Sequence, residues 1–264
     1  MKYWAVFKTS WSNGFVYRLN FLLWRARSVI IVLTVYFLWD TIFQNNPAAF
    51  GYTHEKILTY VFMTLLLRSL ILGGRSIDVG GEISDGRLSN YLLRPVNYFY
   101  YWFTRDWADK LLNMIFSIAE ITVLYFWLRP QIMFPTDSAT ILLFLAAVSI
   151  GIGLNFVIGF ITSTATFWAP GNTWGFWFIY LVILEVLSGI MFPLYVLPKI
   201  AYDLLMLTPF PYLLYFPTAV YLGKLELTLI LRGLLVSGVW LVALYWLSRK
   251  FWNKGVMVYQ SEGR

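Results

Sequence analysis

Residues 138–184 read SATILLFLAAVSIGIGLNFVIGFITSTATFWAPGNTWGFWFIYLVIL and contain no charged side chain. A helix that crosses the hydrocarbon core of a bilayer needs roughly 17 to 25 apolar residues, so this run is too long for one crossing. The segment WAPGNTWG, residues 168–175, supplies a Pro-Gly-Asn turn flanked by tryptophans, which favour the membrane interface. We therefore predict two consecutive membrane-spanning helices, at 139–168 and 174–192.

The rest of the chain has the composition of a multi-pass membrane protein. Of its 264 residues, 59% are hydrophobic and 12% are charged, whereas a soluble domain averages about 25% charged residues. Further stretches that are long and apolar enough to cross a bilayer lie at 24–43, 57–73, 111–128 and 227–248. We predict an all-α membrane protein with six transmembrane helices in a single transmembrane domain, residues 1–264.

The distribution of basic residues predicts the orientation of these helices. Most of the 20 lysine and arginine residues fall near the N-terminus, in the connection after the second span, or near the C-terminus. Because cytoplasmic loops are enriched in lysine and arginine, we expect a protein of the cell (inner) membrane with both termini in the cytoplasm. The net charge of +7 then reflects topology, and we expect no nucleic acid partner. Arg25, Arg27 and Arg68 lie within or beside spans and are expected to snorkel towards the headgroups.

The N-terminal segment 1–22 is predicted to form an amphipathic helix on the membrane surface. Within it, aromatic and aliphatic residues recur every three or four positions, while Lys2 and Lys8 fall elsewhere. Such a pattern is typical of a helix that lies in the interface with its apolar face in the lipid. The apolar positions are Trp4, Phe7, Trp11, Phe15 and Leu19. Gly14 interrupts the pattern and is expected to weaken or kink the helix.

The connection after the second span, residues 74–104, is the largest predicted cytoplasmic piece. Asp85 is predicted to cap a short helix that ends at Arg94, with Leu88 and Leu92 on one face. Pro95 then forces the preceding residue out of helical geometry.

Residues 193–224 are apolar enough for a bilayer but contain too many prolines for one straight helix. Irregular backbone is tolerated at membrane depth only where protein or a water-filled cavity covers it. We therefore predict a re-entrant segment of short helices before the last span; the alternative is an interfacial loop with surface helices. The prolines are Pro193, Pro198, Pro209, Pro211 and Pro217.

Polar residues near the centre of predicted spans are the candidates for a functional site. Glu120 and Glu185 each occupy such a position, where an ionised side chain costs roughly 2.5 to 3.5 kcal/mol. Either they line a polar translocation route or carry protons, or they pair with other groups and hold helices together. Asn155 belongs to a stripe of small and polar residues on one face of 139–168, which allows close helix packing or forms part of a substrate wall. The stripe comprises Ala147, Gly151, Asn155, Gly159 and Ser163.

Several kinds of chemistry have no motif in this sequence. The chain has no cysteine and no phosphate-binding G-x-x-x-x-G-K-[ST] segment, so ATP hydrolysis would require another chain. His54 is the only histidine and is assigned no role. We therefore expect no catalytic residue, no metal and no cofactor in this chain.

Three segments together carry a family resemblance. They are the surface helix leading into YRLNF (17–21), the connection GEISDGRLSNYLLRPVNYF (81–99), and the last outer segment, which runs from SGIMFPLYVLPK (188–199) to LTPFPYLLYFPTAVYLG (207–223). In order and predicted topology the chain resembles the permease subunits of type-2 ABC transporters, the drug and polysaccharide exporter group. The resemblance extends over nearly the whole chain.

This resemblance implies a six-helix permease that pairs with a second copy or a sister permease in the bilayer. It also implies a pair of separate ATPase subunits, which bind ATP and Mg and contact the first cytoplasmic connection. The coupling contact would then comprise Gly86, Leu88, Leu92, Arg94 and Pro95. The substrate would be a hydrophobic drug, a lipid or a glycan.

Two other functions remain as alternatives. Glu120 and Glu185 favour an ion-coupled secondary transporter, although the chain has no detectable inverted repeat. A membrane enzyme would need convergent polar residues at one interface, and the sequence indicates no such cluster.

Overall fold

The computed structural model describes residues 2–14, 18–45, 48–49, 51–135 and 137–259. Apart from a two-stranded antiparallel hairpin, the regular elements of the described residues are all helices, and the prediction of an all-α membrane protein is confirmed at this level. The elements in chain order are α1 (Lys2–Gly14), α2 (Arg18–Asn45), β1 (Ala48–Ala49), β2 (Tyr52–Thr53), α3 (His54–Leu67), the π-helix η1 (Arg68–Leu72), α4 (Asp78–Ser84), α5 (Ser89–Leu92), α6 (Tyr98–Leu128), α7 (Ser138–Thr164), η2 (Ala165–Phe167), η3 (Pro170–Asn172), α8 (Thr173–Leu187), η4 (Leu194–Val196), α9 (Lys199–Leu205), η5 (Phe210–Tyr212), α10 (Tyr215–Tyr221) and α11 (Leu227–Val258).

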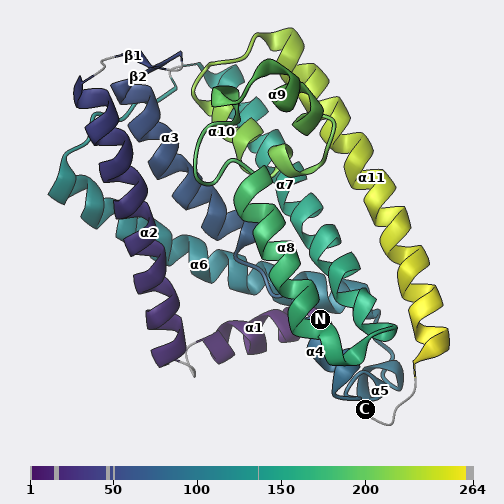
Figure 1. The fold of residues 1–264 in the computed structure, drawn as a ribbon. Helices are drawn as coiled ribbons and strands as arrows, with labels where there is room; N and C mark the ends of the chain where they lie inside the picture. Colours follow the sequence, from purple (N-terminus) through teal and green to yellow (C-terminus); the bar gives the residue numbers. More distant parts are fainter. Residues whose placement is uncertain (1, 15–17, 46–47, 50, 136, 260–264) are drawn as a thin grey trace.

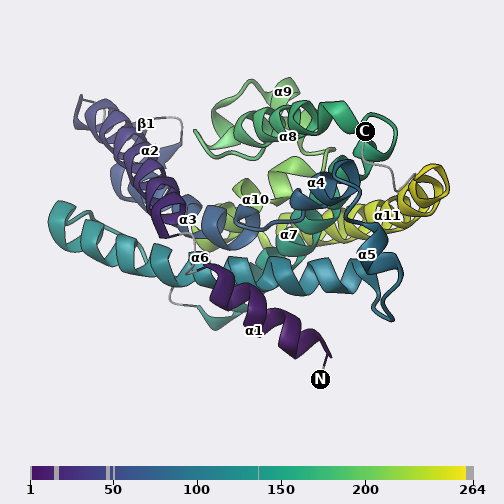
Figure 2. The same cartoon turned by 90° about the horizontal axis from the view of Figure 1, so that it is seen from below.

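The long helices run between two ends of the molecule (Figure 1). At one end lie α1, α4 and α5 together with the last turns of α11; at the other lie the hairpin and α9 (Figure 1). Helix α6 runs obliquely across the bundle, and α8 lies on the side opposite α1 (Figure 2). Helix α7 is central and packs against α11, α10, α8 and α4.

Four helices are long and apolar enough to cross a membrane, counting only the residues that the structure describes. They are Leu22–Gln44, Tyr98–Leu128, Ser138–Phe167 and Leu227–Val258. The two other predicted spans are helical but shorter or divided: 57–73 consists of α3 and η1, and α8 has 15 residues. Helix α8 ends before the predicted 192 because Gly189 takes a positive φ of 84°, and Tyr60 donates a hydrogen bond of 2.5 Å to its carbonyl. The count of six crossings is therefore not confirmed.

Three predicted boundaries differ from the structure. Helix α6 begins at Tyr98, because the Asn97 side chain accepts the Tyr100 N–H at 3.3 Å, so the connection 74–104 ends earlier than predicted. Asp85 does not start a helix; it ends α4. Helix α1 ends at Gly14 instead of continuing to residue 22, and α2 begins at Arg18.

The aromatic face predicted for the N-terminal helix is present in α1. Phe7 stacks on Trp4 with ring centroids 5.4 Å apart and on Trp11 at 5.9 Å. Phe15 and the side chain of Leu19 lie outside the described residues. The helix packs against α6, and Lys2 donates to the carbonyl of Pro95 at 3.2 Å.

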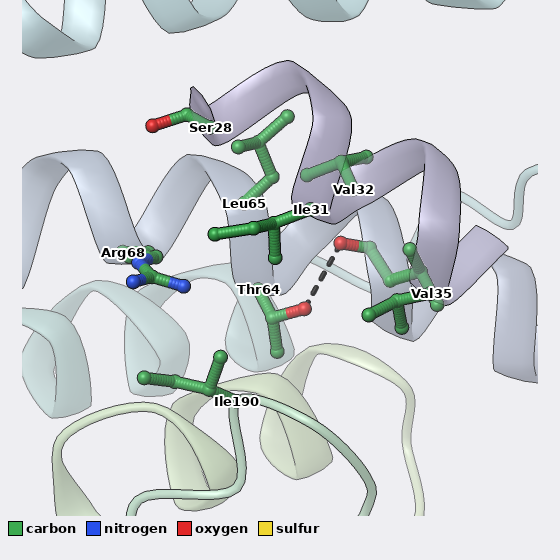
Figure 3. A pocket seen from close by; sticks show the side chains of 9 residues that line it. Ser28, Ile31, Val32, Val35, Thr64, Leu65, Arg68 and Ile190 are labelled. Atoms are coloured by element: carbon green, nitrogen blue, oxygen red, sulfur yellow. Dashed lines mark hydrogen bonds between the residues drawn. The ribbon is translucent and has the colours of Figure 1, made fainter. Parts of the chain in front are cut away.

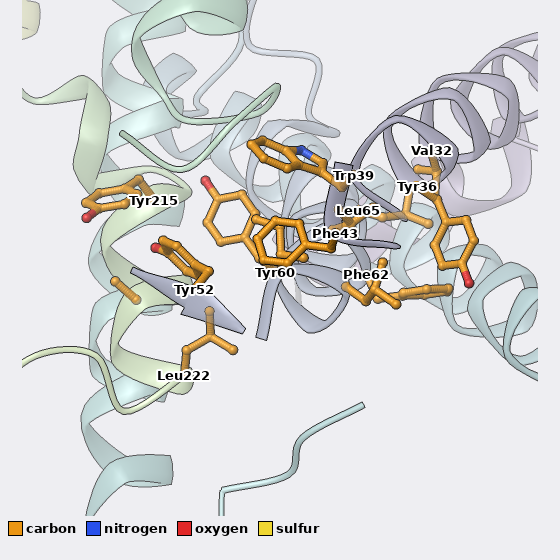
Figure 4. Packing of buried hydrophobic residues seen from close by; sticks show 14 of the residues in the cluster. Val32, Tyr36, Trp39, Phe43, Tyr52, Tyr60, Phe62, Leu65, Tyr215 and Leu222 are labelled. Atoms are coloured by element: carbon orange, nitrogen blue, oxygen red, sulfur yellow. The ribbon is translucent and has the colours of Figure 1, made fainter. Parts of the chain in front are cut away.

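Aromatic side chains dominate the core near the hairpin. Tyr36 of α2 meets Phe62 of α3 edge to face at 6.0 Å, and Tyr52 meets Tyr60 in the same way at 6.4 Å (Figure 4). Edge-to-face pairs add attraction beyond the area they bury. This cluster fixes α2 on α3 and connects both to Tyr215 of α10.

The small-residue stripe of α7 packs within the chain. Gly151 lies against Ile71 and the carbonyls of Tyr212 and Leu213, where a larger side chain would hold the backbones apart. Ser163 donates to the carbonyl of Ser76 at 3.1 Å. The stripe therefore places α10 and the segment after η1 directly against α7.

The proline-rich segment is divided into the short helices η4, α9, η5 and α10, which both the re-entrant prediction and its interfacial alternative contain. Pro193 and Pro198 immediately precede η4 and α9, and Pro209 precedes η5. Pro211 lies within η5, and Pro217 is in the first turn of α10, where its missing N–H leaves no helical bond unmade. The part from residue 211 to 220 is buried against the long helices.

Packing of α10 on α11 provides a test of this arrangement. Gly233 lies so close to the ring of Phe216, which is 1% exposed, that a β-carbon would overlap it. We expect Gly233→Val to lower the free energy of unfolding by about 1–3 kcal/mol, measured by thermal unfolding in detergent. Gly238→Val on the same helix is the control, since a β-carbon at Gly238 would have no atom within 4 Å. Equal losses in the two variants would contradict the packing.

Candidate functional site

The second predicted span contains a π-helix at its end. Helix α3 passes directly into η1, where residues Arg68–Leu72 form a π-helical turn. Such a turn accommodates an extra residue in a helix and is frequent at functional sites. Arg68 and Ser69 are its first residues, and their side chains contact different neighbouring helices.

Arg68 forms an ion pair with Glu185 of α8. The distance from Nη2 to Oε1 is 2.5 Å, and the side chains are 24% and 29% exposed. The prediction that Arg68 snorkels is wrong, because a carboxylate lies within hydrogen-bond distance and provides a stronger partner than the interface. The pair connects η1 with α8.

Glu120 of α6 is also paired. Arg25 of α2 donates Nε to Glu120 Oε1 at 2.6 Å and contacts Oε2 through Nη2. Arg25 also donates to Ser117 at 2.8 Å and to Ser69 at 3.4 Å, and its side chain is 10% exposed. The prediction that Arg25 snorkels is therefore wrong: a bidentate carboxylate and two hydroxyls satisfy the guanidinium inside the protein. The network connects α2, η1 and α6.

A cavity of about 710 Å³ lies beside these ion pairs. Asn155 lines it from α7, and its Oδ1 accepts a hydrogen bond of 2.7 Å from Tyr180 of α8. Glu185 lines the same cavity, whereas Glu120 reaches it only through Arg25. The structure thus brings two of the three candidate residues to one cavity and connects the third to it.

The predicted coupling residues differ in their accessibility. Gly86 has a positive φ of 71° in the turn between α4 and α5, a conformation that favours glycine. Leu88 is 0% exposed, so it holds the turn and is not available to a partner. Leu92 is 46% exposed and Leu93, which the sequence did not single out, is 88% exposed. Leu88 precedes α5 and lies one helical turn from Leu92, whose N–H donates to the Leu88 carbonyl at 3.1 Å, but only Leu92 of the two is accessible.

Arg94 and Pro95 lie on the surface after α5. The Arg94 guanidinium lies over the ring of Tyr91, 5.5 Å from its centroid, and Pro95 accepts the hydrogen bond from Lys2 described above. Both residues are exposed. Leu92, Leu93, Arg94 and Pro95 therefore form one continuous exposed stretch of this connection.

A buried charged cluster, which the sequence reasoning missed, holds this connection against α6. Lys110 and Asp106 are both 0% exposed and form an ion pair of 2.9 Å. Lys110 also donates to the carbonyl of Ile71 at 2.7 Å, and Asp106 accepts the Ser76 N–H at 3.2 Å. In the sequence, the i,i+4 spacing of Asp106 and Lys110 on one helix indicates that these two side chains can pair. Two further pairs, Arg75–Asp109 and Arg105–Glu82, bind the connection to the same helix.

The end of α11 supports the connection from the other side. Trp252 stacks on Tyr98 with ring centroids 4.6 Å apart, and the Tyr98 hydroxyl donates to Glu82 at 2.7 Å. The Ser89 N–H donates to the hydroxyl of Tyr259 at 3.3 Å. The position of α5 is therefore fixed by both α6 and α11.

A model of the family described as ABC-2 family transporter protein matches residues 29–263, which is most of the chain. The chain belongs to the ABC-2 transporter family. It is a permease subunit of the type-2 ABC class, and membership in this family implies association with ATPase subunits. A search of curated proteins found no significant match to the permease.

Proposed function

We propose that this permease forms the substrate path of an ATP-driven exporter. It works by alternating access with a second permease, either a copy of itself or a sister chain, and ATP is hydrolysed on separate ATPase subunits. Six segments cross the cell (inner) membrane, with α3–η1 and α8 as the second and fifth, and residues 193–224 re-enter from the outer side. Both termini are cytoplasmic.

The observation that carries this proposal is the cavity between α2, η1 and α8. It has room for a substrate group, and its lining includes Asn155 and Glu185. Beyond the cavity, α2 and α8 expose apolar side chains, among them Ile30, Phe178 and Val182. Exposed apolar faces on both walls suit contact with a second permease or with lipid.

The contact with the ATPase is proposed at the exposed part of the first connection. Leu92 and Leu93 present apolar surface at the end of the molecule where α1 and the last turns of α11 also lie (Figure 1). The lysines and arginines of α1, of the first connection and of the end of α11 place this end in the cytoplasm under the proposal. A displacement of α5 would be transmitted through α4 to residues 73–78, which line the cavity.

Reconstitution tests the proposed function directly. The permease with an ABC ATPase subunit is expected to move substrate into or out of proteoliposomes only when ATP and Mg are supplied. The alternative, an ion-coupled secondary transporter, rests on Glu120 and Glu185 and predicts transport by the purified permease alone when an ion gradient is imposed. Gradient-driven transport without ATP would therefore replace the proposal by this alternative.

Replacement of Glu185 tests the role of the cavity. Glu185→Gln removes the negative charge that pairs with Arg68. Losing this charged hydrogen bond costs about 1.4 kcal/mol, so we expect transport to be roughly tenfold slower. Glu226→Gln is the control, because Glu226 is exposed before α11 and its side chain makes no capping bond. Transport by Glu185→Gln equal to that of the control at every pH would show that the pair only holds helices together.

A further inference from the structure

The wall of the cavity is rich in hydrogen-bond donors. Four arginines line it, and three of them are paired with carboxylates. Arg25 contacts both carboxylate oxygens of Glu120, and the Nε of Arg75 lies 3.1 Å from an oxygen of Asp109. Arg68 uses one N–H for Glu185. The four are Arg25, Arg27, Arg68 and Arg75.

Arg27 has no ion pair among the residues that the structure describes. Its guanidinium lies over the ring of Trp24, 5.2 Å from the centroid, and the side chain is exposed at the cavity. A guanidinium carries five N–H donors and stays charged at any physiological pH. An arginine stacked on tryptophan in this way is oriented to bind an oxyanion with two parallel hydrogen bonds.

The acceptors of the cavity do not cancel this surplus. The Asn155 Oδ1 is occupied by Tyr180, which leaves the amide NH₂ as a donor. Asp78 also lines the cavity; burial raises the pKa of its carboxyl, while Arg75, Arg105 and Arg87 oppose that rise. Glu185 also lines the cavity, and its Oε1 accepts a hydrogen bond from Arg68. Both carboxylates of the wall therefore lie beside arginines, and Arg27 is the lining arginine without an ion pair among the described residues.

A small apolar crevice of about 20 Å³, room for a single water molecule, adjoins this donor-rich wall. It shares Ser28, Ile31, Leu65, Arg68 and Ile190 with the cavity. Val32 and Val35 of α2 and Val61 of α3 also line the crevice. Arg68 lies at the end opposite Val35 (Figure 3). The main cavity adds Trp177, Leu181 and Leu184 to the apolar lining. Charged donors at one end and apolar walls beside them match a molecule with an anionic head and a hydrocarbon part.

We propose that the cavity binds an amphiphile with an anionic head, a phosphate or a carboxylate, which Arg27 and Arg68 hold while its hydrocarbon part lies against Trp177, Leu181 and Leu184 of α8. This assignment rests on the proposed transport function and narrows its substrate class. The head is either that of a membrane lipid or that of a free anionic amphiphile.

Binding to the permease alone tests the substrate class separately from ATP-driven transport. Dodecyl phosphate is titrated onto the permease in nanodiscs of phosphatidylcholine, with dodecyltrimethylammonium as the cationic probe of the same chain length. We expect saturable binding of dodecyl phosphate and at least about tenfold weaker binding of the cation, the ratio expected from one charged hydrogen bond. Equal or tighter binding of the cation would overturn the assignment, whatever the transport assay gives.

Matched variants locate the head group. Arg27→Gln is expected to weaken dodecyl phosphate binding roughly tenfold, and Arg27→Lys less, because lysine keeps the charge but loses the bidentate geometry. Lys250→Gln is the control: Lys250 lies over Trp246 at 5.1 Å on α11, which contributes no residue to the cavity. Equal effects of Arg27→Gln and Lys250→Gln would overturn the assignment.

A last arm distinguishes the two sources of the head. The titration is repeated in nanodiscs that contain phosphatidylglycerol. Competition by this lipid supports a membrane lipid as the ligand, and unchanged binding of dodecyl phosphate supports a free amphiphile. Both results are consistent with an anionic head, and the comparison with dodecyltrimethylammonium remains decisive if Arg27→Gln does not fold.

Discussion

A permease carrying Leu92→Asp is expected to reach the membrane in normal amounts and to lose ATP-driven transport by about 100-fold or more. Leu92 is 46% exposed in α5, so an aspartate there costs the isolated permease little. At a contact with an ATPase subunit the same carboxylate would be buried without a partner. Such a charge costs about 3–5 kcal/mol, which is enough to uncouple the two subunits.

The matched control is Asn90→Asp, which places the same charge two residues earlier on α5. Asn90 is exposed but points away from Leu92 in helical geometry, so transport is expected to stay within about threefold of the unmodified protein. ATP hydrolysis, transport and copurification of the ATPase are measured for both variants. Undiminished ATP-driven transport by Leu92→Asp would remove α5 from the coupling contact.

Lys110→Met is expected to lower the free energy of unfolding by about 3–5 kcal/mol, since it leaves a buried carboxylate without its counter-charge. Lys110 and Asp106 are both 0% exposed. The substitution also removes the donor to the Ile71 carbonyl at the end of the π-helix. Unfolding in detergent measures the loss, and reduced yield in the membrane is its expected consequence in cells.

Arg87→Met serves as the control for this variant. Arg87 pairs with Asp85 at 2.7 Å, but both side chains are more than half exposed. An exposed pair contributes at most about 1 kcal/mol, so this variant is expected to unfold almost like the unmodified protein. Similar losses in both variants would show that the buried cluster does not hold the connection against α6.

The sequence predicted the helical architecture where the signal is local. Long charge-free runs and turn residues identified α7 and α8, and the prolines predicted the broken segment before α11. Boundaries were less accurate because they depend on capping contacts: Asn97 starts α6 earlier than hydropathy suggests, and Gly189 ends α8.

The partners of the intramembrane charges could not be predicted. Glu120 and Glu185 were identified as costly, but Arg25 and Arg68 lie about one hundred residues away in the chain, and both were expected to snorkel. Sequence spacing defines neighbours on one helix and says nothing about which helices meet. The π-helix that orients Arg68 and Ser69 has no sequence signature of its own.

Accessibility of residue 181 to a thiol reagent tests the central claim, that the cavity beside α8 is the substrate path and that ATPase subunits open and close it. The natural chain has no cysteine, so Leu181→Cys reports this wall of the cavity alone, and Val242→Cys on the exposed face of α11 serves as the control. The account predicts that a membrane-impermeant maleimide labels position 181 from the cytoplasmic side without nucleotide and fails to do so when the ATPase is trapped with ATP and vanadate. Labelling that is the same in both states, or that occurs only from the outer side without nucleotide, would contradict it.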